Sequence, residues 1–562
     1  MNIFQKEIIK ILKQQTKLKE EQILEVLEIP LNPEFGDYAF PCFTLSKTLK
    51  KSPKDIAEEL TRKIIPTKLI NRIQPIGPYI NFFTNKTKLT ELTLKQIIKG
   101  KDKYGSSSIN KNKRIMVEYS APNSNKPLHI GHLRNDSIGM LISNLLEFTG
   151  AKIIKANLVN DRGIHICKPM LAYQKWMKNK KPNIKSDHFV GDLYVKFEKA
   201  AKDNENLKEE AQELLKKWEK GDKKTLALWK KINFWAIQGI KQTYTLYGSK
   251  FDVWFFESEF YDKAQLLVKK ALDKKLFFKD ETGAIIAKLE PKLPNRIIQR
   301  SDSTKLYITQ DLALTKLKFE RYKLDKAIWV VGSEQNLHLQ QLFKIMEELG
   351  FKWAKDCYHL SYGMVNLTTG KMKSREGTVI DADDLIQDTI NLAKKEIQKR
   401  EKLNKTQLEK RAKEIALSAI KFSLLKIENH KDILFDPEKA ISFEGETGPY
   451  LQYSHARASS ILRKAKTLKK PKFDQLNSKE ELTLINLLSK FPEIVSKASE
   501  TLKPHLITNY GFELSQSFNE FYSTCPVLKA EEKDSRLYLV KATKQVLKNT
   551  LKILNITPLE KM

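Results

Sequence analysis

Residues 114–159 constrain the fold of this chain more than any other segment. In order they contain a strand-like run at 114–120, a loop with two prolines at 121–127, a helical pattern of apolar residues at 131–148 and a second strand-like run at 152–159. Gly150 stands just after the helical pattern, where glycine commonly ends a helix. A strand, a loop, a helix and a strand in this order form one half of a parallel nucleotide-binding sheet. The predicted fold class is therefore α/β, with a Rossmann-like parallel sheet.

The remaining chain is arranged around this sheet. A second strand–helix–strand pattern spans 327–365, and the helical, Lys/Glu-rich segment 168–295 is interpreted as an insertion that splits the sheet. Residues 101–113 look like a linker. Because 562 residues are too many for one hydrophobic core, several domains are expected. The predicted domains are an α+β N-terminal domain at 1–110, the parallel-sheet domain at 111–385 and an all-α C-terminal domain at 386–562.

The chain carries 100 Lys and Arg residues against 68 Asp and Glu residues, a net charge of +32. Such a surface attracts polyanions, nucleic acid first. The lysines are spread along the whole chain, however, and their abundance resembles a drift in nucleotide composition, to which we assign about half of the excess. The charge therefore supports nucleic-acid binding only in combination with other features.

Other global features concern location and metal binding. No run approaches the roughly 20 apolar residues that a membrane helix needs, and the N-terminus resembles neither a secretory signal nor a mitochondrial presequence. The four cysteines are far apart and form no Cys-x-x-Cys, which fits a reducing compartment and neither disulfides nor a zinc site. We expect a cytoplasmic protein without membrane association and without a protein-bound metal.

The motif His129-Ile130-Gly131-His132 stands at the start of the helix predicted at 131–148. Histidines three residues apart share a helix face, and a helix N-terminus offers free N–H groups and partial positive charge to a phosphate. Gly131 leaves room for a nucleotide, and the histidines can donate hydrogen bonds to phosphoryl oxygens. We predict that His129, Gly131 and His132 bind ATP and that the two histidines act in catalysis. Two unrelated surface histidines are the alternative.

A basic stretch at 371–377, Lys-Met-Lys-Ser-Arg-Glu-Gly, follows a predicted strand much later in the chain. A mobile basic loop can close over a triphosphate and stabilise the leaving pyrophosphate. Taken alone, this composition is common on protein surfaces, so its weight comes from its pairing with the histidine motif. We predict that Lys371 and Lys373 act in catalysis. The predicted ATP contacts in this stretch are Met372, Lys373 and Ser374.

Together, these motifs resemble the two signatures of class I aminoacyl-tRNA synthetases, His-Ile-Gly-His and Lys-Met-Ser-Lys-Ser. The longer string at 120–134, SAPNSNKPLHIGHLR, resembles the arginyl-tRNA synthetases in particular. Further strings with that resemblance stand at 32–38, 77–83, 160–163, 307–311, 332–338, 445–457 and 521–526. The similarity runs from end to end and is weakest at 168–295. It implies a catalytic parallel-sheet domain, an N-terminal domain that contacts tRNA and a helical anticodon-binding domain.

By this resemblance, Tyr307, Asp311 and Gln335 bind the arginine substrate. Asn123 resembles the residue that binds the α-amino group of the substrate. The chemistry fits, because a guanidinium is planar and presents parallel donors that suit a carboxylate such as Asp311. A substrate without this fork leaves buried acceptors unpaired, so we expect its rejection by a factor of about 10² or more. A strand-end aromatic and a helix N-cap are the alternative interpretation of Tyr307 and Asp311.

The basic stretch departs from the family pattern, which has Lys where this chain has Ser374. Lys126 lies three residues before His129, in the loop beside the predicted phosphates. Arginyl enzymes that lack the loop lysine often carry an upstream lysine of this kind. We therefore expect Lys126 to act in catalysis by supplying the missing charge.

The predicted helix around 450–457 carries aromatic and basic side chains that suit unstacked anticodon bases. The predicted tRNA contacts are Tyr450, Gln452, Tyr453 and Arg457. For about half of them, packing of the domain is the alternative. His165, His338 and His455 are interpreted as structural.

The resemblance implies ATP-dependent ligation of L-arginine to tRNA(Arg) through an arginyl-adenylate, by a monomer, with Mg²⁺ accompanying ATP. Without a P-loop or a Gly-x-Gly-x-x-Gly motif, a kinase, an ATPase or an NAD enzyme is disfavoured. The main alternative is a tRNA-binding relative that has lost adenylation, which the altered stretch at 371–375 favours. A class I enzyme for another amino acid, such as cysteine, is disfavoured by Asp311 and by the absence of a zinc-ligand cluster.

Overall fold

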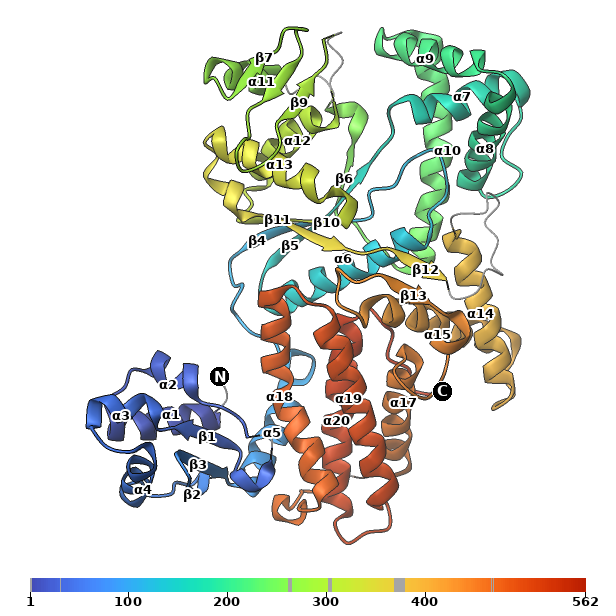
Figure 1. Cartoon of the computed structure of the whole chain (residues 1–562). Helices are drawn as coiled ribbons and strands as arrows, with labels where there is room; N and C mark the ends of the chain where they lie inside the picture. The colour runs from blue at the N-terminus through green and yellow to red at the C-terminus, as the bar shows by residue number, and fades with distance from the viewer. Residues whose placement is uncertain are drawn as a thin grey trace.

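Figure 1 shows the computed structural model of the chain, which describes residues 3–30, 32–260, 265–301, 306–367, 380–465, 467 and 469–562. In this view a parallel sheet lies across the middle of the molecule, two lobes lie above it and a helical domain lies below it. The N-terminal domain lies beside the helical domain. In the part of the chain that the structure describes, no helix is both long enough and apolar enough to cross a membrane.

The parallel sheet has the strand order β11-β10-β4-β5-β6. Its strands are β4 (Arg114–Glu118), β5 (Lys152–Val159), β6 (Val253–Phe256), β10 (Lys326–Gly332) and β11 (Cys357–Tyr362). Helix α6 (Ile130–Phe148) connects β4 to β5, and Gly150, at φ 101°, turns the chain after the helix. The α/β class is confirmed, together with the elements predicted around 114, 131, 152 and 327. The last strand of the pattern predicted at 327–365 is divided between β11 and the short β12 (Val365–Leu367).

Alternate residues of the strands belong to different hydrophobic cores. Ile115 and Val117 of β4 lie in the same core as α6, whereas Met116 lies in the core of α12 (Tyr307–Tyr322) and α13 (Asn336–Glu348). Successive side chains of a strand point to opposite faces, so both faces of the sheet are covered, as is usual for parallel sheets. Each buried side chain of this size contributes roughly 1.5–3 kcal/mol, and this packing holds the carboxyl edge of the sheet in place.

The predicted insertion at 168–295 is not one unit, which corrects the sequence interpretation. Its first part is a helical bundle of α7 (Ile164–Trp176), α8 (Ser186–Asp203), α9 (Asn206–Glu219) and α10 (Lys223–Tyr247). The chain then returns to the parallel sheet as β6, which pairs with β5. Helix α11 (Gln265–Asp273) and the antiparallel strands β7 (Phe277–Lys279), β8 (Ile285–Ala287) and β9 (Arg296–Gln299) form the second part. Strand β6 has only four residues, which is too short for a periodic pattern to reveal.

The C-terminal domain is helical, as predicted, apart from one strand. Its main helices are α14 (Ala382–Gln398), α15 (Lys405–Leu425), α17 (Gly448–Ala465), α18 (Lys479–Thr501), α19 (His505–Thr524) and α20 (Lys533–Ile553), with the short α16 (Pro437–Ala440). Strand β13 (Ile433–Phe435) was not predicted, and it pairs in parallel with β12. This pairing joins the helical domain to the region that follows the parallel sheet.

The N-terminal domain is α+β, as predicted. Its antiparallel sheet has the order β1-β3-β2. Its elements are α1 (Ile3–Thr16), α2 (Glu20–Val26), β1 (Tyr38–Pro41), α3 (Phe43–Leu49), α4 (Pro53–Lys63), β2 (Ile70–Ile76) and β3 (Tyr79–Thr84). Helix α5 (Lys86–Gly100) then lies against α18 and α20 of the helical domain.

Residues 101–113 do not form a loose linker, which is a second correction. The Tyr104 side chain is 7% exposed, and its hydroxyl donates to the carbonyl oxygen of Leu488 at 2.9 Å. Asp102 accepts hydrogen bonds from Lys548 and Lys552 of α20, at 2.9 and 2.8 Å. The polar, Gly/Ser-containing composition suggested a linker, but these contacts attach the segment to the helical domain.

Candidate active site

The loop that leaves β4 begins with two residues in the left-handed backbone region, Ser120 at φ 77° and Ala121 at φ 49°. Such conformations are costly and persist only where neighbours hold them. The N–H of Ser120 donates to Asn135 Oδ1 at 2.6 Å, and the N–H of Ala121 donates to Asn157 Oδ1 at 3.2 Å. The turn directs the loop along the carboxyl edge of the sheet, where Asn123 forms a bridge with the residue directly after β5.

His129 and His132 cap the N-terminus of α6 reciprocally. His129 Nδ1 accepts from the N–H of Gly131 at 3.2 Å, and His132 Nδ1 accepts from the N–H of His129 at 3.1 Å. A neutral imidazole that accepts through Nδ1 carries its proton on Nε2, so both rings present an Nε2–H donor. A Cβ at position 131 would lie 2.9 Å from the His129 ring, and Gly131 therefore permits this close packing.

Both histidine rings are neutral at pH 7. Burial, reinforced by the Lys126 ammonium, lowers the pKa of His129 to about 4. Burial, together with the proximity of His129 and Lys126, holds the pKa of His132 well below its ordinary value. The structure therefore brings the predicted residues Lys126, His129 and His132 together. Phosphate groups would favour the protonated rings, so a bound polyphosphate is expected to raise both pKa values.

Residues 380–382, which follow the basic stretch at 371–377, pair with residues 128–130 of the histidine motif. The N–H of Ile130 donates to the carbonyl oxygen of Ile380 at 3.0 Å, and the N–H of Ala382 donates to that of Leu128 at 2.9 Å. His129 and Asp381 form the antiparallel bridge between these bonds. The predicted residues Lys371, Met372, Lys373 and Ser374 lie outside the described residues.

Tyr307 and Asp311 lie one turn apart at the start of α12. Asp311 Oδ2 lies 2.7 Å from His338 Nε2, and the Tyr307 side chain is 57% exposed. Gln335 is exposed in the short helix η4 (Ser333–Gln335) that follows β10. The Tyr307 hydroxyl lies 3.8 Å from the position that a Cβ on Gly163 would take. Three of the predicted arginine contacts therefore surround the carboxyl edge of the sheet, and His338, predicted to be structural, orients Asp311.

Glu257 is a site residue that the sequence did not reveal. It follows β6 directly and is 6% exposed, and its Oε2 has no hydrogen-bond donor among the described residues. The amide of Gln310, oriented to satisfy both neighbours, donates to Glu257 Oε1 at 2.9 Å and accepts from Arg162 Nη1 at 3.2 Å. Burial raises the pKa of Glu257 to about 8, which Arg162 opposes and the nearby carboxylates Asp161 and Asp311 reinforce.

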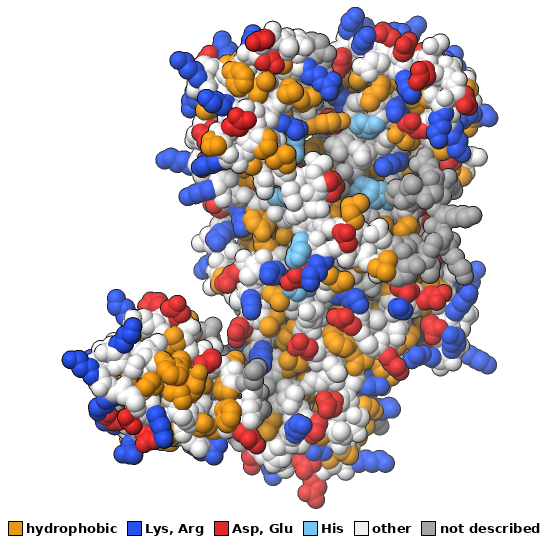
Figure 2. All heavy atoms as spheres, viewed as in Figure 1, with side chains coloured by type: hydrophobic (Ala, Val, Ile, Leu, Met, Phe, Trp, Pro, Cys, Tyr) orange, Lys and Arg blue, Asp and Glu red, His pale blue; other side chains and the backbone are white. Residues whose placement is uncertain are grey.

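The candidate residues share one position in the fold. Asn123 follows β4, Glu257 follows β6 and Gln335 follows β10. In open α/β sheets, ligands bind at the carboxyl ends of the strands. Figure 2 shows histidine side chains near the middle of the face in view, where the two lobes meet the sheet.

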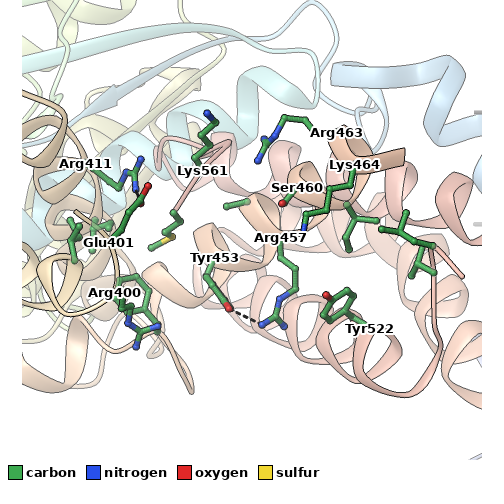
Figure 3. A pocket seen from close by; sticks show the side chains of 18 of the residues that line it. Arg400, Glu401, Arg411, Tyr453, Arg457, Ser460, Arg463, Lys464, Tyr522 and Lys561 are labelled. Carbon is green, nitrogen blue, oxygen red and sulfur yellow. Dashed lines mark hydrogen bonds and ion pairs between the residues drawn. The ribbon is translucent and has the colours of Figure 1, made fainter. Parts of the chain in front are cut away.

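A second concave site lies in the helical domain, about 690 Å³ in volume (Figure 3). Seven of its lining residues are basic, namely Arg400, Arg411, Arg457, Arg463, Lys464, Lys529 and Lys561. Arg457 Nη2 donates to the Tyr453 hydroxyl at 2.8 Å, and the guanidinium lies 5.0 Å from the centre of the Tyr522 ring. A basic cavity with exposed aromatic rings can hold an unstacked base and its phosphate.

Only two of the four predicted tRNA contacts line this cavity, Tyr453 and Arg457. Gln452 is fully buried and donates to the carbonyl oxygen of Thr557 at 2.8 Å, which corrects its prediction as a tRNA contact. Tyr450 packs against the Phe512 ring, with centroids 5.9 Å apart. For Gln452 the physical reason is helical periodicity, because a residue next to Tyr453 in sequence points about 100° away from it.

Comparison with known proteins identifies the family. Residues 93–437 match the family model described as tRNA synthetases class I (R), catalytic domain. The chain belongs to the arginyl-tRNA synthetase family. Two further models agree with this assignment: residues 2–84 match the arginyl-tRNA synthetase N-terminal domain, and residues 451–562 match the DALR anticodon-binding domain.

Named relatives within the arginyl-tRNA synthetase family cover almost the whole chain. The chain is 45% identical to the arginine–tRNA ligase of Treponema denticola and 42% identical to that of Borrelia hermsii, in each case over 97% of this chain and 96% of the relative. The solved arginyl-tRNA synthetase of Thermus thermophilus is similar with a TM-score of 0.84 and 26% identity, covering 99% of this chain and 100% of that one. The family assignment therefore applies to all three domains and not to the catalytic domain alone.

Proposed function

We propose that this chain ligates L-arginine to tRNA(Arg) in two steps, through an arginyl-adenylate. The observation that carries the proposal is the pair of reciprocally capping histidines at the N-terminus of α6, with the buried carboxyl group of Glu257 at the same edge of the sheet. Family membership and the named relatives support it.

In the first step, a carboxylate oxygen of arginine attacks the α-phosphorus of ATP and the bond to pyrophosphate breaks. The Nε2–H groups of His129 and His132 donate to phosphate oxygens, and the free N–H groups of the helix favour the growing negative charge. No covalent enzyme intermediate forms, so catalysis consists of positioning and charge stabilisation.

Mg²⁺ is expected to enter with ATP as part of the substrate. The described carboxylates closest to His129 do not fit a protein-held ion. Asp381 accepts from two backbone N–H groups of α14, and Asp383 accepts from Lys185 and His188. No step is assigned to a protein-bound metal.

In the proposed amino acid site, acidic side chains bind the positively charged guanidinium of arginine. We assign Asp311, Glu257 and Tyr307 to the guanidinium, with Asn123 and Gln335 at the α-amino end. Among the residues that the structure describes, Glu257 Oε2 has no donor, and Asp311 accepts from His338 through Oδ2, which leaves Oδ1 to the substrate. Charged hydrogen bonds contribute about 1.5–3 kcal/mol each, so amino acids that lack the guanidinium are rejected.

In the second step, the terminal ribose of the tRNA, by class I resemblance its 2′-hydroxyl, takes the arginyl group and AMP leaves. We assign tRNA contacts to Tyr453 and Arg457 in the basic cavity. Tyr450 and the N-terminal domain remain candidate contacts.

The experiment that tests this function is ATP–pyrophosphate exchange with each standard amino acid, with and without tRNA. We expect exchange with arginine alone. Exchange with no amino acid, even with tRNA present, contradicts the proposal and supports a tRNA-binding protein without adenylation. Exchange with cysteine and not arginine contradicts the assignment of the pocket.

Lys126 is proposed to supply the charge that Ser374 does not. Its ammonium lowers the pKa values of both His129 and His132, and this proximity to the two histidines supports the proposed contact with the phosphates. We expect Lys126→Ala to lower the rate of adenylate formation by roughly tenfold to a hundredfold, the effect of one charged hydrogen bond. An unchanged rate of pyrophosphate exchange would show that the charge comes from elsewhere.

We further propose that the protein acts as a monomer in the cytoplasm. Light scattering after size exclusion should then give a mass near 65.1 kDa. A mass near twice that value contradicts the monomer.

A further inference from the structure

A polar cluster connects the helical bundle of the insertion to the start of α14. Lys185, at the N-terminus of α8, is its centre. The Lys185 Nζ donates to Asp383 Oδ2 at 2.5 Å, to Thr243 Oγ1 at 2.6 Å and to Asp187 Oδ2 at 2.9 Å. Asp187 is fully buried and belongs to α8, Thr243 belongs to α10, and Asp383 belongs to the first turn of α14.

His188 adds a second connection between the same helices. Its Nε2 lies 3.0 Å from Asp383 Oδ2 and 3.6 Å from Asp381 Oδ2. Thr243 Oγ1 also donates to the other oxygen of Asp383, at 3.0 Å. Asp383 therefore has three partners from the helical bundle, Lys185, His188 and Thr243, although it belongs to a separate helix much later in the chain.

A metal ion does not explain this cluster. The ligand atoms of Asp187, His188 and Asp383 lie within 4.8 Å of one another, which a cation would require. However, the Lys185 ammonium already lies between the two carboxylates and supplies the positive charge.

The cluster is directly connected to the catalytic histidine motif. Asp381 accepts from the N–H of Asp383 at 2.8 Å, and this cap fixes the backbone at the start of α14. The preceding backbone pairs with residues 128–130 in the bridge between His129 and Asp381. Asp383 is therefore linked, through Asp381 and this backbone pairing, to the backbone that holds His129.

Helix α8 also contacts the loop on the other side of the motif. Gly191 packs so closely that a Cβ there would lie 2.8 Å from Pro127 Cδ and 3.8 Å from Lys126 Cα. Helix α8 thus contacts the loop before His129 directly, at Pro127. Through Lys185 and its acceptor Asp383, it is also connected to the backbone of residues 380–382, which pairs with residues 128–130.

We propose that Lys185, His188 and Asp383 are positioning residues for adenylate formation. They fix the start of α14, and through its backbone pairing they hold His129 in the geometry that the transition state requires. None of the three needs to touch the substrate. This inference rests on the proposed function, because it assigns the role to a step of that reaction.

The test compares Lys185→Met and Asp383→Asn with a matched control, Lys168→Met. Lys168 pairs with Glu198 at 2.6 Å inside the same helical bundle, between α7 and α8, and has no described contact with α14. We expect each test variant to lower kcat of pyrophosphate exchange by about tenfold or more, since small misplacements near reacting groups are costly. The KM for arginine should stay within about twofold, and Lys185→Arg should restore part of kcat.

A general loss of structure is distinguished by melting temperature and by a milder variant, Thr243→Val, which removes one hydroxyl and keeps the shape. It should lower kcat by about threefold to tenfold, because the hydroxyl accepts from Lys185 and donates to Asp383 while both charges of the cluster stay in place. The inference is overturned if Thr243→Val and Lys185→Met keep wild-type kcat, or if Lys168→Met loses as much as they do. A wild-type chain without arginine-dependent exchange would contradict the proposed function itself, whereas active wild type with unchanged variants contradicts only the positioning role.

Discussion

At the scale of single residues, Glu257 combines two properties that a substrate can satisfy together. Its Oε2 has no donor among the residues that the structure describes, and burial raises its pKa to about 8. A guanidinium supplies both a donor and a positive charge that favours the ionised carboxylate. The adjacent Tyr307 is affected by the same carboxyl group, because burial and the charge of Glu257 raise the pKa of Tyr307.

We therefore predict that Glu257→Gln raises the KM for arginine by roughly tenfold to a hundredfold, the loss of one charged hydrogen bond. The KM for ATP should change by no more than about twofold, because the histidine motif is untouched. The matched control is Glu259→Gln, an exposed carboxyl group two residues later. Equal effects of the two substitutions in steady-state aminoacylation would remove Glu257 from the pocket.

The raised pKa of Glu257 also predicts a pH dependence. Below about pH 8 the carboxyl group of the free protein is protonated, so binding of the arginine cation must release a proton. Arginine affinity should thus fall as the pH decreases below 8, by at most about tenfold per pH unit. Isothermal titration in two buffers of different ionisation enthalpy would detect the released proton. The idea fails if Glu257→Gln retains the pH dependence of the wild type.

At the scale of helices and strands, the sequence predicted the elements with a strong pattern and missed the short ones. Strands β4 and β5 and helix α6 follow one another without interruption, carry apolar residues with the expected spacing and are bounded by clear loop residues. Strand β6 has four residues, and β13 has three. Their positions depend on pairing with distant strands, which a single sequence does not encode locally.

The same limit explains which site residues were missed. His129, His132 and Lys126 stand in one continuous string, so the string alone indicated them. Glu257 becomes a candidate only once β6 is known to be a strand of the parallel sheet, because only then does Glu257 stand at a carboxyl end. Lys185 was missed for a related reason, since its partner Asp383 is almost two hundred residues away.

Helix α8 makes a separate prediction through Gly191. A Cβ at this position would lie 2.8 Å from Pro127 Cδ, so the loop that carries Lys126 must move to accept it. We expect Gly191→Ala to lower kcat for pyrophosphate exchange by about threefold to thirtyfold and to destabilise the fold by about 1–3 kcal/mol. Lys199→Ala, at an exposed position of the same helix, is the control. A kcat equal to that of the control would show that the loop adapts without affecting the site.

At the scale of the whole molecule, positive charge does not by itself mark the nucleic-acid surface. Figure 2 shows Lys and Arg side chains scattered over the visible face and interspersed with acidic groups. The net charge of +32 can attract tRNA from a distance. Recognition needs a shaped site, and the cavity around Arg457 combines basic groups with the Tyr453 and Tyr522 rings.

The catalytic and helical domains are joined by Arg134 of α6, which is fully buried. Its guanidinium donates to the carbonyl oxygens of Gly363, Met364, Asn429 and Lys431, at distances of 2.6–3.0 Å. The helix whose N-terminus carries His129 and His132 thus also anchors the segment that leads into the helical domain. The same helix therefore connects the histidine motif to the start of the helical domain that contains the basic cavity.

This arrangement predicts that damage to the cavity changes tRNA use without changing arginine use. Arg457→Ala removes the hydrogen bonds to Tyr453 and Asn519 and the contact with the Tyr522 ring. Stacking and cation–π contacts with a base contribute about 1–3 kcal/mol, so the KM for tRNA should rise by roughly fivefold to a hundredfold. The KM for arginine should stay within about twofold, because the partners of Arg457, namely Tyr453, Asn519 and Tyr522, all belong to the helical domain. Lys497→Ala, which removes one exposed charge outside the cavity, separates this effect from the loss of general attraction. If both variants raise the KM for tRNA equally, the cavity has no special role and diffuse charge alone binds the tRNA.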